Sequence, residues 1–537
     1  IDQIASKDLT NLELAYQLFI LVLSALAMYA LRFVWRKYIL GTANRLGRIL
    51  RYRLFEHFTR MSPSFYQTYR TGDLMAHATN DINAVVGVAG GGVMSAVDAS
   101  ITALVTILTM FFVLDWRLTL IAILPLPFMA WGTSLIGRKN HESFKAAQEA
   151  FSDLNNKVQE SVSGIKVTKS FGYQDAETAA FARINQDVFK KNILAAKYNA
   201  LFDPMVLIFV GLSYLLTLIF GGLFISQGRL TVGELVTFIT YLDMLVWPLQ
   251  AMGYLFNISQ RGAVSYERIE SLLAKESDVT EVASPIKDIK NGRLDYSIQK
   301  FAYDDRPTLR DIRFSIDQGQ TLGIVGVTGS GKTTLLRLLL REQDIQDGNI
   351  CLAGHDIRDY SLSTLRSLIG YVPQDQILFA TSIRDNIRFG NPSLSDEDVI
   401  AVTKLCGIYE DIMQMPDGFD TLVGERGVSL SGGQKQRLAM CRALILNPEI
   451  LILDDSLSAV DAKTEHLILD NLKRERFGKT TLITAHRLSA VVHADLILVL
   501  DQGRIIESGS HQELLTQDGW YANTYQNQQL AESLEEV

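Results

Sequence analysis

The sequence predicts two joined domains, an α-helical membrane domain followed by an α/β domain. Three observations carry this prediction. The chain has 537 residues, which is more than a single hydrophobic core usually organises. Long runs without charge are concentrated in its first half. From about residue 290, short β-rich runs alternate with helical patterns and glycine-rich turns.

Five apolar runs in the first half are long enough to cross a bilayer, which requires about 20 apolar residues in helical form. They cover Leu14–Leu31, Ile82–Leu114, Leu118–Gly137, Pro204–Gln227 and Leu235–Gln260, interrupted by charge only at Asp98 and Asp243. The alternative, buried helices of a soluble protein, is disfavoured because such helices keep a polar stripe. We therefore expect about five membrane spans.

Basic residues set the expected orientation of these spans. After the first run the chain carries Arg32, Arg36, Lys37, Arg45, Arg48, Arg51, Arg53 and Arg60, whereas residues 1–13 are mainly acidic in charge. Positive side chains favour the cytoplasmic side, so residue 1 is expected outside and the C-terminal half in the cytoplasm. Because residue 1 is Ile and no signal segment precedes the first run, we expect one further membrane helix ahead of this sequence.

The stretches between the spans are long, charged and helical in pattern, so residues 36–80 and 138–200 are predicted to continue the membrane helices into the cytoplasm. The pattern breaks at Thr71–Asp73 and at Ser163–Gly164, where a helix pair would turn and contact another part of the protein. The predicted organisation is a membrane domain over 1–262, a linker over 263–290 and the second domain over 291–537.

Composition excludes several classes of protein. The net charge of −8 and the isoelectric point of about 5.6 argue against a nucleic-acid-binding protein. A hydrophobic content of 48% excludes a disordered chain. The three cysteines, Cys351, Cys406 and Cys441, lack metal-ligand spacing and are predicted to be reduced core residues.

The most specific motif is Gly326–Thr333, GVTGSGKT, which fits the P-loop pattern. A strand-like run, Thr321–Val325, precedes it and a helical run, Thr334–Leu340, follows it, as this motif requires. Backbone N–H groups would wrap the phosphates, a lysine would meet the β- and γ-phosphates, and a threonine would hold Mg²⁺. The predicted ATP-binding residues of the loop are Gly326, Thr328, Gly329, Ser330, Gly331, Lys332, Thr333 and Thr334.

Two further motifs follow the P-loop. Ile450–Asp454 reads as a buried parallel strand, with Asp454 as a Walker B carboxylate for the Mg²⁺ shell; the alternative is an aspartate that caps the next helix. Leu430–Gln434, LSGGQ, starts a helix whose N–H groups could bind phosphate. Residue chemistry alone does not separate this second motif from an ordinary glycine-rich turn.

Together these motifs resemble the ATP-binding cassette of ABC transporters, in which LSGGQ is the signature. The resemblance implies that Ser431, Gly432, Gly433 and Gln434 contact the ATP of a partner cassette. It implies that Tyr303 stacks on adenine, although a core aromatic of a strand is the alternative. It also identifies Gln374 with the Q-loop glutamine, Asp461 with the D-loop and His486 with the switch histidine, and groups Thr333, Gln374 and Asp454 around Mg²⁺.

The resemblance extends over the chain to the type IV ABC exporter fold, which has six transmembrane helices and one cassette per half. Regions near 69–81 and 160–172 look like its two coupling-helix regions, and Gly424–Gly427 resembles its loop facing the cytoplasmic membrane helices. The likeness is to the BmrC or MdlA type, one subunit of bacterial heterodimeric multidrug exporters. It implies a multi-pass protein of the bacterial cell membrane, with a cytoplasmic ATPase domain that uses ATP and Mg²⁺.

One position departs from the cassette pattern. Asp455 follows the Walker B strand, where the family has the glutamate that acts as general base. The shorter side chain sets the carboxylate back by about 1.5 Å, and a misplacement of ~1 Å can cost ~100-fold in rate. We therefore expect a site with Asp455, Gln374 and His486 to bind ATP and to hydrolyse it slowly, unless backbone adjustment or an extra water compensates. The intact signature would complete the ATP site of a second, different half-transporter.

Asp98, Asp243 and Trp247 are the candidate residues of a substrate cavity. Intramembrane carboxylates usually face a cavity or a partner, so we expect them to attract cationic amphiphilic drugs; a helix–helix hydrogen bond is an equal alternative. Three functions remain open. A subunit of a heterodimeric drug exporter is favoured over a lipid or peptide exporter of the same fold and over an ATP-gated regulatory or channel subunit with little turnover.

Overall fold

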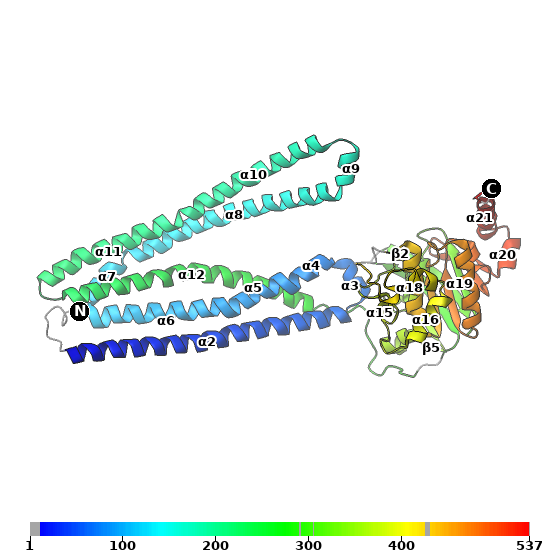
Figure 1. Cartoon of the computed structure of the whole chain (residues 1–537), viewed down its shortest axis with the longest axis horizontal. Helices are drawn as coiled ribbons and strands as arrows, with labels where there is room; N and C mark the ends of the chain where they lie inside the picture. The colour runs from blue at the N-terminus through cyan, green and yellow to red at the C-terminus, as the bar shows by residue number, and fades with distance from the viewer. Residues whose placement is uncertain (1–10, 289–290, 304–305, 425–429, 536–537) are drawn as a thin grey trace. The chain divides into compact units, whose positions relative to one another are not determined.

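The computed structural model describes residues 11–288, 291–303, 306–424 and 430–535. The chain divides into two compact units (Figure 1). Unit 1 holds the residues up to Phe58 together with Gly72–Lys275, and unit 2 holds Thr59–Thr71 together with the chain from Glu276 onward. A short segment of the N-terminal half therefore belongs to the same unit as the C-terminal domain.

Unit 1 is built from helices, several of them very long. They are α2 (Asn11–Arg60), α4 (Thr71–Ala76), η1 (His77–Asp81), α5 (Ile82–Gly87), η2 (Val88–Gly92), α6 (Val93–Thr109), η3 (Met110–Leu114), α7 (Trp116–Ile123), α8 (Pro125–Ser163), α9 (Ile165–Ser170), α10 (Gln174–Ala200), α11 (Phe202–Ser226) and α12 (Val232–Leu273). Within the described residues, five helical stretches are long and apolar enough to cross a membrane: Leu12–Arg60, Thr71–Leu114, Trp116–Ser163, Gln174–Ser226 and Val232–Leu273. The prediction of about five spans is confirmed.

Local chemistry fixes where several of these helices begin. The Asp115 carboxylate accepts from the backbone N–H groups of Arg117 and Leu118 at 2.8 and 2.9 Å, so it caps α7 and ends the preceding stretch. Thr231 and Glu234 form a capping box at the start of α12. The predicted break at Ser163–Gly164 coincides with the end of α8.

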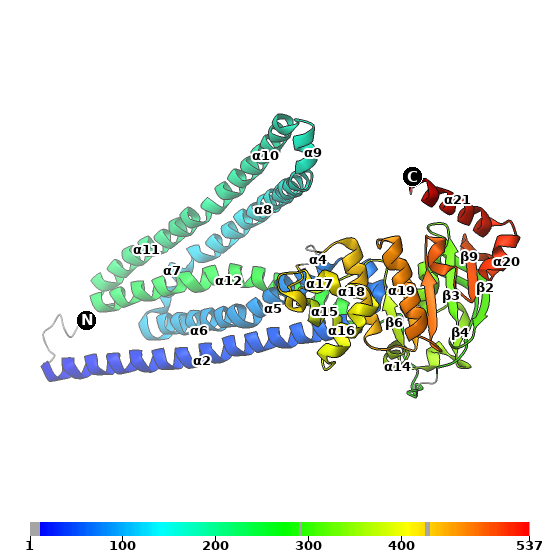
Figure 2. The ribbon, with the colours of Figure 1, turned by 45° about the vertical axis from the view of Figure 1, so that its right-hand side comes forward.

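Packing within unit 1 joins long helices in pairs, some of them far apart in the sequence. Helix α8 lies beside α10, and α6 lies beside α12, in both Figure 1 and Figure 2. The approach of α12 to η2 is close, because a Cβ on Gly262 would lie 2.2 Å from Cγ2 of Val88. One buried cluster contains Met110, Leu118, Ala122, Leu230, Phe238, Leu242 and Leu245.

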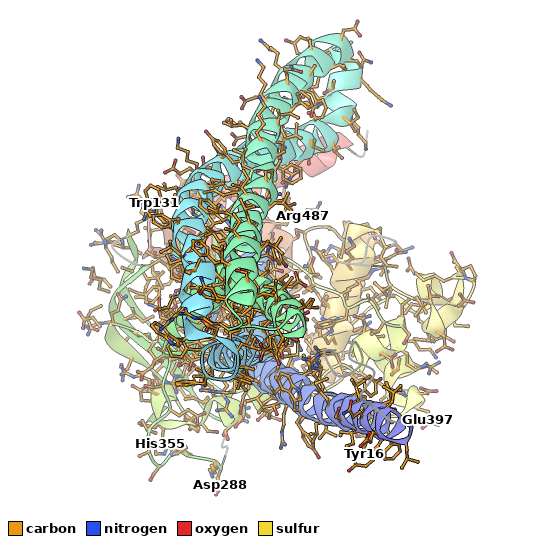
Figure 3. The ribbon with its side chains drawn as sticks, turned by 90° about the vertical axis from the view of Figure 1, so that its left-hand side faces the viewer. Tyr16, Trp131, Asp288, His355, Glu397 and Arg487 are labelled. Carbon is orange, nitrogen blue, oxygen red and sulfur yellow. The ribbon has the colours of Figure 1, made fainter. Side chains whose placement is uncertain are left out.

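The apolar half of α2 is not covered by the other described helices. No residue in the most apolar stretch of α2 is buried. Figure 3 shows side chains, Tyr16 among them, projecting from this helix on several sides. Apolar side chains exposed in this way suit contact with lipid, where every backbone polar group is satisfied inside the helix.

Unit 2 contains two sheets. The larger has the order β10-β9-β3-β8-β7-β6, parallel except for the edge strand β10, and the smaller is antiparallel with the order β2-β1-β4-β5. The strands are β1 (Leu294–Tyr303), β2 (Arg306–Ile316), β3 (Thr321–Gly326), β4 (Asp347–Leu352), β5 (His355–Asp356), β6 (Ile369–Val372), β7 (Ile450–Asp454), β8 (Thr480–Thr484), β9 (Leu496–Asp501) and β10 (Arg504–Gly509). Every residue of β7 and β8 is buried, as expected for central parallel strands.

The helices of unit 2 are shorter. They are α3 (Pro63–Thr68), α13 (Lys332–Leu339), α14 (Leu362–Ser367), α15 (Ile383–Ile387), α16 (Asp396–Leu405), α17 (Tyr409–Met413), α18 (Gly432–Leu444), α19 (Ala462–Glu475), α20 (His511–Thr516) and α21 (Trp520–Glu535), with 3₁₀ turns η4 (Ile357–Asp359), η5 (Gly418–Asp420) and η7 (Leu488–Val491). The parallel sheet separates two cores. Along β7, Leu451 and Leu453 enter one core, and Ile450 and Ile452 enter the other, as the alternation of a strand requires.

The predicted linker over 263–290 is structured in two parts. Helix α12 continues to Leu273, and the chain after Lys275 belongs to unit 2. There the N–H of Ile286 donates to the carbonyl of Asp359 at 2.8 Å, and the Glu281 carboxylate accepts from the N–H of Leu362 at 2.7 Å. We call residues 276–288 the strap, because they are hydrogen-bonded along the surface of unit 2.

Candidate functional site

The predicted P-loop connects β3 to α13, and its glycines adopt backbone conformations that other residues avoid. Gly326 has a φ of 142°, and a Cβ there would lie 2.0 Å from the carbonyl oxygen of Leu500. Gly329 and Gly331 have φ values of 82° and 103°. Helix α13 then begins at Lys332, so its free N–H groups point into the loop, as a phosphate site requires.

Two polar side chains of the loop are aimed inward. The buried Lys332 Nζ donates to the carbonyl oxygens of Gly326 and Val327 at 2.8 and 3.1 Å. Burial lowers the pKa of the Lys332 ammonium, and the carboxylates of Asp455 and Asp454 oppose that shift. The buried Ser330 hydroxyl has no hydrogen-bond partner among the described residues, which suits a group that awaits a phosphate oxygen.

The Walker B carboxylate is held from three sides. Asp454 Oδ1 accepts from the hydroxyls of Thr333 at 3.0 Å and Thr484 at 2.8 Å, and Oδ2 accepts from the hydroxyl of Tyr371 at 3.3 Å. Asp454 is 1% exposed, so the carboxylate depends on these donors. Mg²⁺ prefers oxygen ligands, and the neighbouring oxygens of Thr333 and Asp454 would supply them.

Tyr371 and Thr484 are parts of this site that the sequence motifs did not assign. Each is on a strand next to β7: Tyr371 pairs with Ile452, and Thr484 pairs with Asp454. Burial, together with the charge of Asp454, raises the pKa of the Tyr371 hydroxyl, which therefore stays protonated as a donor. Only the strand register could have identified these two residues.

A cavity of about 200 Å³ brings most of the predicted residues together. Its lining contains Thr308, Thr328, Gly329, Ser330, Gly331, Lys332, Thr333, Thr334, Gln374, Asp454, Asp455, Thr484 and His486. The phosphate loop, the predicted magnesium ligands and the three predicted catalytic residues therefore face one space. Such a space is large enough for the phosphates of a nucleotide, and cationic and N–H donors line it.

Asp455 occupies an unusual backbone position in this cavity. Its φ is 47°, in the left-handed region that aspartate tolerates better than most residues. Its N–H donates to the carbonyl and the hydroxyl of Thr484 at 3.1 and 3.0 Å. The backbone that carries the carboxylate is thus fixed to the neighbouring strand.

Tyr303 lies outside the 200 Å³ cavity. It lines a smaller neighbouring cavity with Arg337, Leu338 and Glu342, which α3 closes through Pro63, Ser64 and Gln67. Its ring packs edge-on against Phe301, with centroids 5.1 Å apart. Tyr303 is therefore adjacent to α13, the helix that follows the phosphate loop.

The signature and the D-loop also stand outside the cavity of their own chain. Ser431 caps α18, and the Gln434 amide oxygen accepts from the Ser431 N–H at 3.1 Å. Asp461 caps α19 through the N–H of Thr464 at 3.0 Å, a bond that lowers the pKa of its carboxyl. Of the predicted loop Gly424–Gly427, only Gly424 falls within the described residues.

The candidate substrate residues lie on two helices of unit 1. Asp98, on α6, accepts from Arg32 of α2 at 3.4 Å. Asp243, on α12, accepts from the hydroxyl of Tyr214 of α11 at 3.0 Å. Trp247 is one turn further along α12, and its side chain is exposed. Asp98 is therefore paired with a cation, whereas the partner of Asp243 is neutral.

Comparisons with known proteins find matches to both domains of the chain. The ABC transporter transmembrane region family matches residues 4–249, and the ABC transporter family matches residues 309–458. The probable multidrug resistance ABC transporter ATP-binding/permease protein YheI of Bacillus subtilis (strain 168) is 44% identical, over 99% of this chain and 91% of its own length. The multidrug resistance-like ATP-binding protein MdlA of Escherichia coli (strain K12) is 41% identical, over 100% of this chain and 91% of its own length.

A solved structure extends the match to the fold. A bacterial Atm1-family ABC exporter with ATP bound aligns with a TM-score of 0.82 and 30% identity, over 97% of this chain and 92% of its own. The predicted fold class, a helical type IV exporter membrane domain followed by an ATP-binding cassette, is confirmed. The chain is thus a multi-pass membrane protein with a cytoplasmic ATPase domain, and it belongs to the ABC transporter family.

Proposed function

We propose that this chain is one subunit of a heterodimeric ABC exporter that moves hydrophobic and amphiphilic drugs out of the bacterial cell. The observation that carries the heterodimer is Asp455, which stands in the nucleotide cavity where the family has a glutamate. A chain with this substitution binds ATP at its own site and depends on a second subunit for most of its turnover.

The anchored backbone of Asp455 supports slow hydrolysis. Its N–H is held by two hydrogen bonds to Thr484, so the backbone cannot easily advance to compensate for the shorter side chain. A general base must reach the attacking water, and a shortfall of ~1 Å costs about 100-fold. When bound, Mg²⁺ neutralises charge on the transferring phosphate, which favours ATP binding even where the base is weak.

The signature supports the role of a partner. Ser431 and Gly432 stand at the N-terminus of α18 and do not line the 200 Å³ cavity. A helix N-terminus attracts phosphate, so this one suits the ATP bound by the other subunit. ATP held between the two cassettes then favours their closure, and hydrolysis at the partner's site releases them.

The drug substrate is supported by the relatives and by charge in unit 1. YheI and MdlA both carry multidrug resistance names. Asp243 lies within an apolar helix and accepts a helix–helix hydrogen bond from Tyr214, the alternative role weighed for it, but that partner is neutral and leaves its negative charge uncompensated. Asp98 is compensated by Arg32. We assign cationic drug attraction to Asp243.

The test uses the full chain co-purified with a second half-transporter that has a glutamate after its Walker B strand. Two variants of this chain are compared by steady ATP hydrolysis in lipid nanodiscs. Asp455→Asn should change turnover by less than about twofold, and Gly432→Asp should lower it by at least about tenfold, because only the signature serves the active site. Gly432 suits this purpose because a Cβ there lies 3.6 Å from Cβ of Ala459, an ordinary contact.

The proposal is overturned if Asp455→Asn removes turnover as fully as Gly432→Asp, or if the chain alone hydrolyses ATP as fast as the complex. Lys332→Ala provides the control for ATP binding. A third outcome separates the two parts of the proposal. If turnover is asymmetric as expected, but inverted vesicles take up lipids or peptides and not cationic dyes, the heterodimer is supported and the substrate is a lipid or peptide instead of a drug.

A further inference from the structure

The Tyr371 hydroxyl lies between the magnesium carboxylate and the helix that follows the phosphate loop. It donates to Asp454 Oδ2 at 3.3 Å, and it interacts electrostatically with the Arg337 guanidinium. A phenol hydroxyl has one proton to donate, and here the carboxylate accepts it. The lone pairs of the phenol oxygen are then available to a cation such as the arginine.

Arg337 occupies the last turn of α13. Its Nε lies 3.8 Å from Oε2 of Glu342, an ion-pair distance, and has no hydrogen-bond partner among the described residues. Both side chains form the wall of the small cavity that Tyr303 and α3 also line. A series of neighbouring side chains therefore leads from that wall to the nucleotide site: Glu342, Arg337, Tyr371 and Asp454.

The two oxygens of Asp454 have different surroundings. Oδ1 faces the Thr333 and Thr484 hydroxyls, and Oδ2 faces Tyr371. A carboxylate that ligates a metal is usually hydrogen-bonded through its second oxygen, and that bond sets its orientation. Without Tyr371, the buried Oδ2 would lose a donor and the carboxylate could rotate about its Cβ–Cγ bond.

We propose that Tyr371 and Arg337 act as a pair of positioning residues for the magnesium site, holding Asp454 so that Oδ1 stays beside the Thr333 hydroxyl. Tyr371 donates to the carboxylate, and Arg337 fixes the direction of that hydroxyl. Neither residue lines the 200 Å³ cavity of the phosphate loop, and Arg337 lines the smaller cavity beside Tyr303. Their effect reaches the metal only through Asp454.

The test measures metal affinity rather than turnover. The full chain in nanodiscs is loaded with ATP at 4 °C over a range of buffered free Mn²⁺, and the Mn²⁺ that gives half-maximal retention of ATP is determined. Tyr371→Phe should raise this concentration by roughly tenfold, the range seen for groups that orient metal ligands. ATP binding in excess EDTA and the melting temperature should stay unchanged.

A matched control is Tyr296→Phe, because the buried Tyr296 hydroxyl has no hydrogen-bond partner among the described residues. It should leave the half-saturating Mn²⁺ at the wild-type value. Arg337→Gln should raise it by less than Tyr371→Phe, and the double variant should be no worse than Tyr371→Phe alone, because the two residues act as a unit.

Three results overturn the proposal. The first is a half-saturating Mn²⁺ for Tyr371→Phe equal to that of Tyr296→Phe. The second is an equal loss of metal-free ATP binding and of melting temperature, which indicates a structural role only. The third is fully additive effects of Arg337→Gln and Tyr371→Phe, which would mean that the residues do not work together.

Discussion

At the scale of single residues, the glycines of the phosphate loop differ in what surrounds them. A Cβ on Gly326 would lie 2.0 Å from the Leu500 carbonyl oxygen, whereas a Cβ on Gly329 meets nothing within 4 Å. Both have positive φ, at 142° and 82°. Gly326 is therefore favoured both by its φ and by the space around it, whereas Gly329 is favoured by its φ alone.

Substituting each of these two glycines should distinguish an effect on the stability of the ATPase domain from an effect on ATP binding. Gly326→Ala should destabilise the ATPase domain by about 3 kcal/mol through overlap and strain, and Gly329→Ala by only about 1 kcal/mol. Thermal unfolding of the full chain, with and without ATP, measures both. Gly329→Ala should lose the stabilisation that ATP gives the wild type, because the methyl group crowds the phosphates. Equal melting temperatures for the two variants would contradict the assignment.

The contiguous motifs made most of the nucleotide cavity predictable. Lys332, Thr333 and Asp454 are recognised from short strings, and all three line the 200 Å³ cavity. Tyr371 and Thr484 could not be found this way. Their roles come from strand register across the sheet, and a single sequence does not state which strands are neighbours.

At the scale of elements, the strap is the feature that the sequence described least well. The buried Arg341 donates to the Thr280 carbonyl at 3.0 Å and forms a bidentate pair with Asp344 at 2.9 and 3.1 Å. It also donates to the Tyr360 carbonyl at 3.4 Å. One guanidinium therefore joins the end of the phosphate-loop helix to the strap. Composition suggested only a linker, because these contacts are long-range.

Removing this guanidinium should loosen the strap. Arg341→Ala leaves Asp344 and several carbonyls unpaired, so the expected loss is about 3–5 kcal/mol of unfolding free energy. The matched control is Arg293→Ala, which breaks an exposed pair with Asp295 and should cost about 0–1 kcal/mol. Limited proteolysis within residues 276–288 should accelerate only in Arg341→Ala. A strap that resists protease in this variant would show that Arg341 is not its anchor.

At the scale of the whole molecule, the charged side chains within the apolar membrane domain are the feature most relevant to transport. Hydrophobic run lengths were enough to predict five spans, because the bilayer imposes length and composition on each of them. Which intramembrane carboxylate is compensated could not be predicted. That depends on pairs far apart in sequence, Arg32 with Asp98 and Tyr214 with Asp243.

Neutralising Asp243 should therefore affect cationic substrates selectively. Asp243→Asn should lower uptake of a cationic dye into inverted vesicles by up to about tenfold, equivalent to about 1.4 kcal/mol, and should spare a neutral analogue of the dye. The control is the double variant Arg32→Gln with Asp98→Asn, which removes two charges and leaves the net charge unchanged. Unchanged cationic dye transport in Asp243→Asn would remove this carboxylate from substrate recognition.

The membership of Thr59–Thr71 in unit 2 bears on how the protein can be divided. In this segment the Ser64 hydroxyl donates to the Asp278 carboxylate, and α3 closes the small cavity beside Tyr303. A fragment that begins at Glu276 would therefore lack a piece of its own surface, and a chimera joined at a single splice point would carry a foreign one. The two domains have separate functions, but their segments alternate along the chain. An exchange of the ATPase domain must therefore include Thr59–Thr71 as well as the chain from Glu276 onward.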